Sequence, residues 1–331
     1  MKRAMRTLGR VSLSVLCLSV FLHRSATPAG RAAFDVLHIG FGGAASGLGG
    51  SGVAAVGTLE GVFANPASLA SQPAGIAVLG SYNPYLDMGL WSAAASVTKD
   101  KRGSLAIAAY GLSYGAMNGD IAWNGDPGRL LKSGDLILSV SGGLPLGGLL
   151  ELPFTLDFGL TGRVASQALD ESSLTGLLFD AGMLAGFRTG VGVLSVGLQG
   201  RNFGAVLGAG NGVALPTSLA SGLAWRMNLA RVLSLKVLAD GAYETSEAAW
   251  RGSVGAEAGF FSLAFLRGGY SFAQAGGQAS GLTLGMGVRL KVSTVQVRVD
   301  YAFIHLGDLG GSQHSVQLGF AIEAPPAVPA P

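Results

Sequence analysis

Apolar and polar residues alternate along most of the chain. Between positions 294 and 303, one residue in two is apolar and the intervening residues are mostly polar. The apolar set is Val295, Val297, Val299, Tyr301 and Phe303, and the other set is Thr294, Gln296, Arg298, Asp300 and Ala302. A period of two residues predicts a β-strand with one apolar face. The same period recurs at 154–164, 233–243 and 282–292.

The alternating segments have the length of membrane-spanning strands. Each has about ten residues, which is what a tilted strand needs to cross a bilayer. About fourteen such segments fit between Gly75 and Glu323, and we expect the last of them at Ser315–Glu323. Lipid offers no partner for unpaired backbone groups, so a sheet in a membrane must close on itself. The pattern therefore predicts an all-β fold, a transmembrane antiparallel β-barrel over residues 75–323.

Residues 33–73 do not follow the alternating pattern. They are rich in Gly and Ala, and their only charged residues are Asp35 and Glu60. Eight glycines between Gly40 and Gly57 make this stretch a poor transmembrane helix. Because such low polarity favours burial, we expect residues 33–73 to form an N-terminal hatch, or plug, inside the barrel. Residues 324–331 are rich in proline and predict an extended tail.

The first 29 residues predict a cleavable signal peptide. Four basic residues, Lys2, Arg3, Arg6 and Arg10, precede an apolar run from Val11 to Leu22, and small residues follow it. The run is too short to cross a bilayer as a helix. Export together with a barrel pattern predicts the bacterial outer membrane as the location.

Charge does not support a nucleic-acid partner. The whole chain has a net charge of +3, but five of its 22 Lys and Arg lie in residues 1–29. The remainder carries 17 basic against 19 acidic residues, a net charge of −2. The basic character therefore belongs to the signal peptide, and we expect no nucleic-acid binding.

The sequence offers little for catalysis, and we expect no enzyme, no cofactor and no metal site. Gly47–Gly52 has the spacing of a dinucleotide-binding loop, but no βαβ pattern surrounds it. Gly111–Gly115 has the spacing of a nucleophile elbow, but it lies within an alternating strand. The histidines after the signal peptide, His38, His305 and His314, show no metal-ligand spacing.

Glu257 and Arg267 are predicted to form an ion pair in the lumen. If their strands form a hairpin centred near Ser262, the two side chains lie opposite one another on the same face. We place that face inside the barrel, because an arginine facing the lipid at mid-membrane costs roughly 2–4 kcal/mol. A structural role for the pair is the simpler interpretation, and a role in gating is the alternative.

Asn65-Pro66-Ala67 has two interpretations. Alone, it predicts a helix start, with Asn65 as the N-cap and Pro66 at the first helical position. In its setting, between a Gly-rich start and Ser68-Leu69, it resembles the N-terminal signature of the barrel family that includes FadL-type fatty-acid channels and PorV-type barrels. The later motifs Val254–Glu257, Leu266–Tyr270 and Val299–Phe303 resemble strand motifs of the PorV-like branch.

The resemblance implies a function and a set of partners. A FadL-like barrel implies passive uptake of hydrophobic compounds such as long-chain fatty acids, with outer-membrane lipids and hydrophobic small molecules as partners. We expect Phe41, Phe63, Asn65 and Pro66 of the hatch to form the gate. A PorV-like barrel implies instead a docking or accessory subunit of a secretion or surface-attachment machine, with other envelope proteins as partners. A structural barrel without transport is the third possibility.

Overall fold

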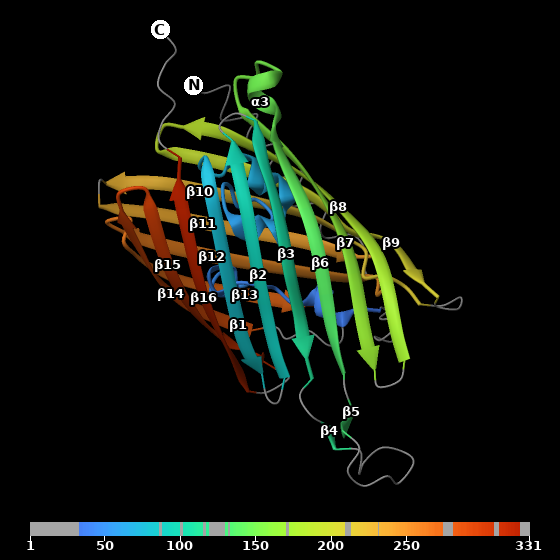
Figure 1. Ribbon diagram of the computed structural model, residues 1–331. Coiled ribbons are helices and arrows are strands. Elements are labelled where there is room, and N and C mark those ends of the chain that lie inside the picture. The colour runs from blue at the N-terminus through green and yellow to red at the C-terminus, as the bar shows by residue number, and fades with distance from the viewer. Residues whose placement is uncertain are drawn as a thin grey trace.

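Fourteen antiparallel strands form a closed barrel (Figure 1). The structure is a computed structural model that describes residues 33–85, 88–99, 102–114, 117–118, 130–131, 133–169, 172–208, 213–230, 232–273, 281–307 and 311–324. The predicted signal peptide and most of the predicted tail lie outside these residues, and both stay predictions. The predicted fold class is confirmed, and so is the strand number.

Each barrel strand pairs with its neighbours in the chain, except that β3 pairs with β6, and β1 closes the barrel against β16. The barrel strands are β1 (Gly75–Tyr85), β2 (Met88–Lys99), β3 (Gly103–Ser113), β6 (Ser133–Pro145), β7 (Thr155–Leu169), β8 (Ser172–Thr189), β9 (Gly192–Leu207), β10 (Ser218–Ala230), β11 (Leu233–Glu244), β12 (Ala249–Phe260), β13 (Ala264–Ala273), β14 (Gly281–Val292), β15 (Val295–His305) and β16 (Ser312–Glu323). Two short strands, β4 (Met117–Asn118) and β5 (Leu130–Leu131), form a separate pair between β3 and β6. The last strand thus begins three residues earlier than Ser315, where the sequence placed it.

The outer face of the barrel is apolar. On β14, Leu282, Leu284, Met286, Val288 and Leu290 are each about half exposed, whereas the intervening Thr283 and Gly287 are buried. None of the helices found in the described residues has the length and apolarity that crossing a membrane requires. A closed barrel with an apolar outer belt has its backbone bonds satisfied and its apolar side chains in lipid. The location is accordingly the bacterial outer membrane.

The connections between consecutive strands, here called joins, differ in length at the two ends of the barrel, and this difference shows which end is periplasmic. Gly75 pairs with Glu323, so β1 begins and β16 ends at the same end of the barrel. Most joins at that end are two or three residues long, at 100–102, 190–191, 231–232, 261–263 and 293–294, and the exception carries α3 (Leu146–Leu149). The two longest joins, 114–132 and 208–217, lie at the other end. Since short turns face the periplasm in such barrels, the end with Gly75 and Glu323 is periplasmic.

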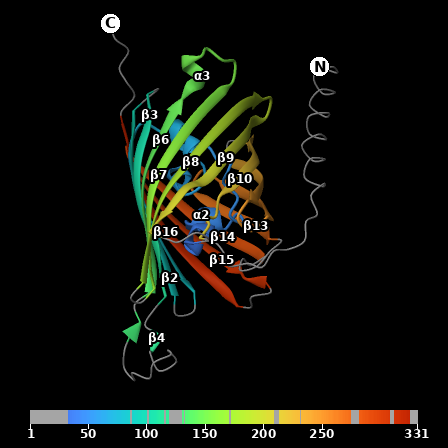
Figure 2. The same ribbon diagram turned by 90° about the vertical axis from the view of Figure 1, so that its right-hand side faces the viewer.

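Residues 33–73, the N-terminal segment, lie inside the barrel and are enclosed by its strands (Figure 2). The segment contains η1 (Asp35–His38), α2 (Gly43–Ser46), η2 (Leu59–Val62) and η3 (Pro66–Ser71). It starts at the extracellular end, where the Ala33 N–H donates to the Ala214 carbonyl at 2.8 Å, and it joins β1 at the periplasmic end. The segment therefore traverses the lumen from one end to the other.

The outward face of β14 allows a test of the lipid-facing belt. We expect Met286→Arg to lower the free energy of unfolding by about 2–4 kcal/mol, because it places a guanidinium on the outer face at the middle of β14, at mid-membrane depth. Val292→Arg, on the same face at the periplasmic end of the strand, should cost only about 0–1 kcal/mol. Urea unfolding in lipid vesicles measures both variants. Equal costs at the two positions would contradict the placement of this face in lipid.

Candidate functional site: the lumen and its N-terminal segment

Glycines on the inner wall let the backbone of the N-terminal segment lie directly against the barrel. A Cβ added at Gly182 of β8 would lie 1.9 Å from the Asn65 side-chain oxygen, and one added at Gly197 of β9 would lie 2.2 Å from the Val53 carbonyl oxygen. Real side chains do not tolerate such distances, so only glycine fits. Seven strands present a glycine of this kind to the segment, namely Gly143, Gly159, Gly182, Gly197, Gly222, Gly255 and Gly269. Gly285 of β14 adds a close approach, since a Cβ there would lie 3.1 Å from the Gly47 Cα.

These eight residues form a glycine track around the lumen. At its β14 end, Gly285 lies against Gly47, and at its β6 end, Gly143 lies against Ala70. The segment therefore advances from 47 to 70 as it passes from strand to strand around the wall. Strand propensity disfavours glycine, and this close approach is the physical reason for the glycines of the track.

Asn65 ties the segment to two strands. Its side-chain amide N–H donates to the Val53 carbonyl at 2.8 Å and lies within reach of the Met183 and Leu198 carbonyls, at 3.3 and 3.4 Å. Its side-chain oxygen accepts from the Ala67 N–H at 3.1 Å and so caps η3, with Pro66 at the first helical position. Asn65 is fully buried. The residue acts as a helix cap and as a link between segment and wall at once.

Inward polar side chains satisfy other backbone groups of the segment. Asp240 of β11 accepts from the N–H groups of Gly52 and Val53, at 2.6 and 2.9 Å. Gln199 donates to the Ala64 carbonyl, and Arg201 donates to the Phe63 carbonyl at 3.1 Å. Buried irregular backbone needs such partners because it lacks those that a helix or sheet provides.

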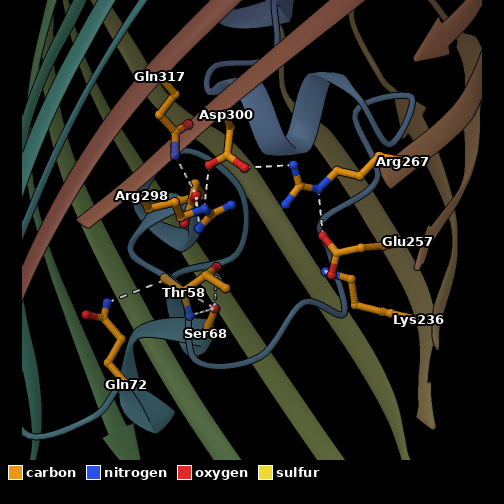
Figure 3. Close-up of polar contacts among 10 residues, drawn as sticks. Thr58, Ser68, Gln72, Lys236, Glu257, Arg267, Arg298, Asp300 and Gln317 are labelled. Atoms are coloured by element: carbon orange, nitrogen blue, oxygen red, sulfur yellow. Dashed lines mark hydrogen bonds and ion pairs between the residues drawn. The ribbon is translucent and has the colours of Figure 1, made fainter. Parts of the chain in front are cut away.

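A buried ion network lies where the segment meets β11–β15 (Figure 3). Arg267 donates to Glu257 through Nε at 2.6 Å and to Asp300 through Nη1 at 2.7 Å, and it has no exposed side-chain surface. Glu257 also pairs with Lys236 at 3.0 Å. Arg298 pairs with Asp300 and, at 2.9 Å, with Glu60 of the segment. We call these six residues the ion network.

The ion network extends beyond what the sequence predicted. The structure places Glu257 and Arg267 directly opposite one another in the β12–β13 hairpin. Asp300, Lys236, Arg298 and Glu60 were missed as partners of this pair. For Asp300, Lys236 and Arg298, the signal in the sequence was a charged residue on the polar face of an alternating strand. Which of these charged residues lie at one height depends on the stagger of the strands.

The four predicted gate residues occupy two places. Phe41 and Phe63 pack with Tyr110 of β3, with ring centroids 4.6–5.7 Å apart, and all three are buried. Asn65 and Pro66 instead lie at the glycine track, against Gly182 and Gly159. The phenylalanines thus form an aromatic contact with the wall, and Asn65-Pro66 forms a polar anchor.

Two cavities flank the segment. The extracellular one has a volume of about 440 Å³ and mixes apolar residues such as Leu37, Phe41 and Leu238 with polar ones such as Arg201 and Glu244. The periplasmic one has about 200 Å³ and lies between the segment and β1, β14, β15 and β16. Thr58, Glu60 and Arg298 line both cavities. These three residues are the partition between the cavities.

The partition is held by several bonds. Gln317 donates to Glu60 at 2.8 Å, beside the Glu60–Arg298 ion pair. The Thr58 carbonyl accepts from Ser68 and from Gln72, each at 3.4 Å (Figure 3). Sequence reasoning marked Glu60 only as one of the few charges of the segment.

The structure also gathers a group that the sequence spacing did not show. His38, Glu244 and Glu247 bring potential metal-ligand atoms within 4.8 Å of one another. His38 lies 3.0 Å from Glu244, and Arg251 forms ion pairs with both carboxylates. The group links η1 to the extracellular ends of β11 and β12.

No protein-family model matches the sequence, and no curated protein matches it either. Solved structures do match the fold. The toluene transporter TbuX of Ralstonia pickettii superposes with a TM-score of 0.56 at 13% identity, over 86% of this chain and 98% of its own. A Pseudomonas aeruginosa FadL homologue gives 0.53 at 14% identity, over 90% and 100%. The chain has the fold of the FadL-type channels. The monoaromatic hydrocarbon channel CymD is similar as well, with a TM-score of 0.55 at 13% identity, over 88% of this chain and 99% of its own.

The glycine track predicts a large effect from one methyl group. Gly182→Ala should lower the free energy of unfolding by about 1–3 kcal/mol, because the new Cβ overlaps Asn65. Gly241→Ala on β11 is the matched control, since an added Cβ there has no atom within 4 Å. Urea unfolding of the two variants checks this. If Gly182→Ala is as stable as Gly241→Ala, the segment does not lie as close to the wall as described.

The ion network predicts a second stability difference. Asp300→Asn should destabilise the barrel by about 3 kcal/mol, because it leaves Arg267 and Arg298 buried with less negative charge. Glu323→Gln removes the partner of Lys291 in an exposed pair, and we expect a change within about 1 kcal/mol. Thermal unfolding in detergent, followed by the gel shift of the folded barrel, compares the two. Similar melting temperatures would show that the buried network does not stabilise the fold.

Proposed function

We propose that the chain is an outer-membrane channel for passive uptake of hydrophobic compounds, such as long-chain fatty acids, with residues 33–73 as its hatch. The observation that carries the proposal is a lumen with a partly apolar cavity on each side of the partition at Thr58, Glu60 and Arg298. The larger cavity has the size and mixed lining of small-molecule sites. TbuX is a toluene transporter and CymD is a monoaromatic hydrocarbon channel, and their similarity in fold supports a hydrophobic cargo.

In this proposal the parts of the segment have different roles. Asn65 and Pro66 anchor the hatch on the glycine track, so the parts of the hatch that lie on the track, residues 47–54 and 65–70, keep contact with the wall. Phe41 and Phe63 form the apolar side of the gate, beside the extracellular cavity. The gate opens when η2, which carries Glu60, moves away from Arg298 and joins the two cavities. The move separates one ion pair and one hydrogen bond and leaves the anchor in place.

A structural barrel without transport is the second candidate. The observation that favours it is the number of buried polar links between segment and wall, at Asn65, Asp240, Gln199 and Arg201. A segment held in this way stabilises a barrel whether or not it moves. Only a flux measurement separates the two functions.

Weakening the partition should raise uptake. We expect cells whose outer membrane carries the Glu60→Ala variant to take up radiolabelled oleate or toluene severalfold faster than cells with the wild-type barrel, because Arg298 and Gln317 lose their contact with the hatch. Cells with wild-type barrel should in turn exceed cells with none. Glu151→Gln, which removes an exposed carboxylate beside α3 that lines neither cavity, is the control and should match wild type.

The two candidates give different results in this assay. Wild-type uptake equal to that of cells without the barrel would reject the channel and favour the structural barrel. Wild-type uptake that Glu60→Ala leaves unchanged, in a folded barrel, would keep the channel but reject the partition as its gate.

A further inference from the structure

Arg289 is a cation at the periplasmic cavity and has no ion-pair partner among the residues that the structure describes. It lies on the inner face of β14 and lines that cavity. Among the described residues it forms no ion pair, and its buried Nε has no hydrogen-bond partner. Its guanidinium lies over the ring of Phe265, 4.7 Å from the centroid. The side chain is thus held in place by an aromatic ring, and no carboxylate of the described residues lies within ion-pair distance of its guanidinium.

The carboxylates that line the same cavity already form ion pairs with other basic residues. Glu60 pairs with Arg298, and Glu323 pairs with Lys291. Arg298, the residue directly opposite Arg289 in the β14–β15 register, is a second cation. Like charges at opposed positions disfavour a sheet, and a half-buried cation favours a nearby anion. The cavity therefore has an excess of positive charge on the β14 wall.

The opposite lining of the cavity is apolar or neutral. Leu59 of the segment and Ala77, Leu79 and Ala321 of the wall line it, and Gln296 adds an uncharged polar side chain. A small inorganic anion would gain nothing from that apolar side. A ligand with a carboxylate at one end and a hydrocarbon chain at the other matches both sides, because a guanidinium can bind a carboxylate through two parallel hydrogen bonds.

We propose that Arg289 binds the carboxylate head group of an amphiphilic cargo on the periplasmic side of the partition, which rests on the proposed uptake function. The site holds fatty-acid-like anions and gives no such contact to a neutral hydrocarbon. The barrel then distinguishes cargo by head group after the hatch has been passed, at its exit.

Binding of octanoate and octan-1-ol to the purified full barrel in nanodiscs tests the proposal. By calorimetry at pH 8, with empty nanodiscs subtracted, Arg289→Gln should weaken octanoate binding about tenfold or more and leave octan-1-ol binding unchanged. Arg289→Lys keeps the charge without the planar fork and should retain the preference for octanoate at lower affinity. The gel shift of the folded barrel verifies that each variant folds.

Lys291→Gln is the matched control. It removes an equal charge two residues further along the same face of β14, from an exposed pair with Glu323, and should leave octanoate binding unchanged. Equal octanoate affinity in Arg289→Gln and wild type would overturn the proposal, and so would an equal loss in Lys291→Gln. Full competition by inorganic phosphate would also overturn it, since it would mark a general anion site.

The uptake assay keeps this proposal distinct from the channel itself. If the wild-type barrel carries toluene but octanoate binding does not depend on Arg289, the exit site fails and the channel stands. If the barrel carries nothing but octanoate binding depends on Arg289, the channel fails and the anion site stands.

Discussion

The close approach between the N-terminal segment and the barrel wall is the contact on which the interior depends. A segment with little regular structure has many unpaired backbone groups, and inside a barrel they need partners from the wall. Gly182 and Gly197 let Asn65 and Val53 reach the strands, and Asp240 accepts from the N–H groups of Gly52 and Val53. Without the glycine track the segment would lie further into the lumen, and its polar groups would be left without these bonds.

The ion network follows from the same enclosure. Arg267 and Asp300 have no exposed side-chain surface, so each depends on the other and on Glu257 and Arg298 for compensation. Glu60 brings the segment into this arrangement, so the network links the segment to the wall. In the gate that we propose, stability and opening meet at Glu60, whereas the Arg267–Asp300 contact belongs to the wall alone.

The fold was readable from the sequence because its signals are local. A period of two in about ten residues marks each strand, and closure follows from the absence of water in lipid. The opposition of Glu257 and Arg267 was readable for the same reason, since one short turn joins their strands. Asp300 joins them from two strands further along the chain, and Glu60 joins from the segment. Those contacts depend on strand stagger and on the path of the segment, which no local pattern encodes. The sequence showed the number of glycines. Their alignment along one track, however, depends on the strand stagger and on the path of the segment.

The path of the segment has a consequence for how the barrel assembles. The segment is the earliest part of the described chain, and it runs the length of the lumen, from Ala214 at one end to β1 at the other. Its track lies on β6–β14, whereas the pairing that closes the ring joins β1 to β16, the last strand to be synthesised. A closed ring admits this segment only through one of its open ends. Laying the segment along β6–β14 before β1 pairs with β16 avoids that passage.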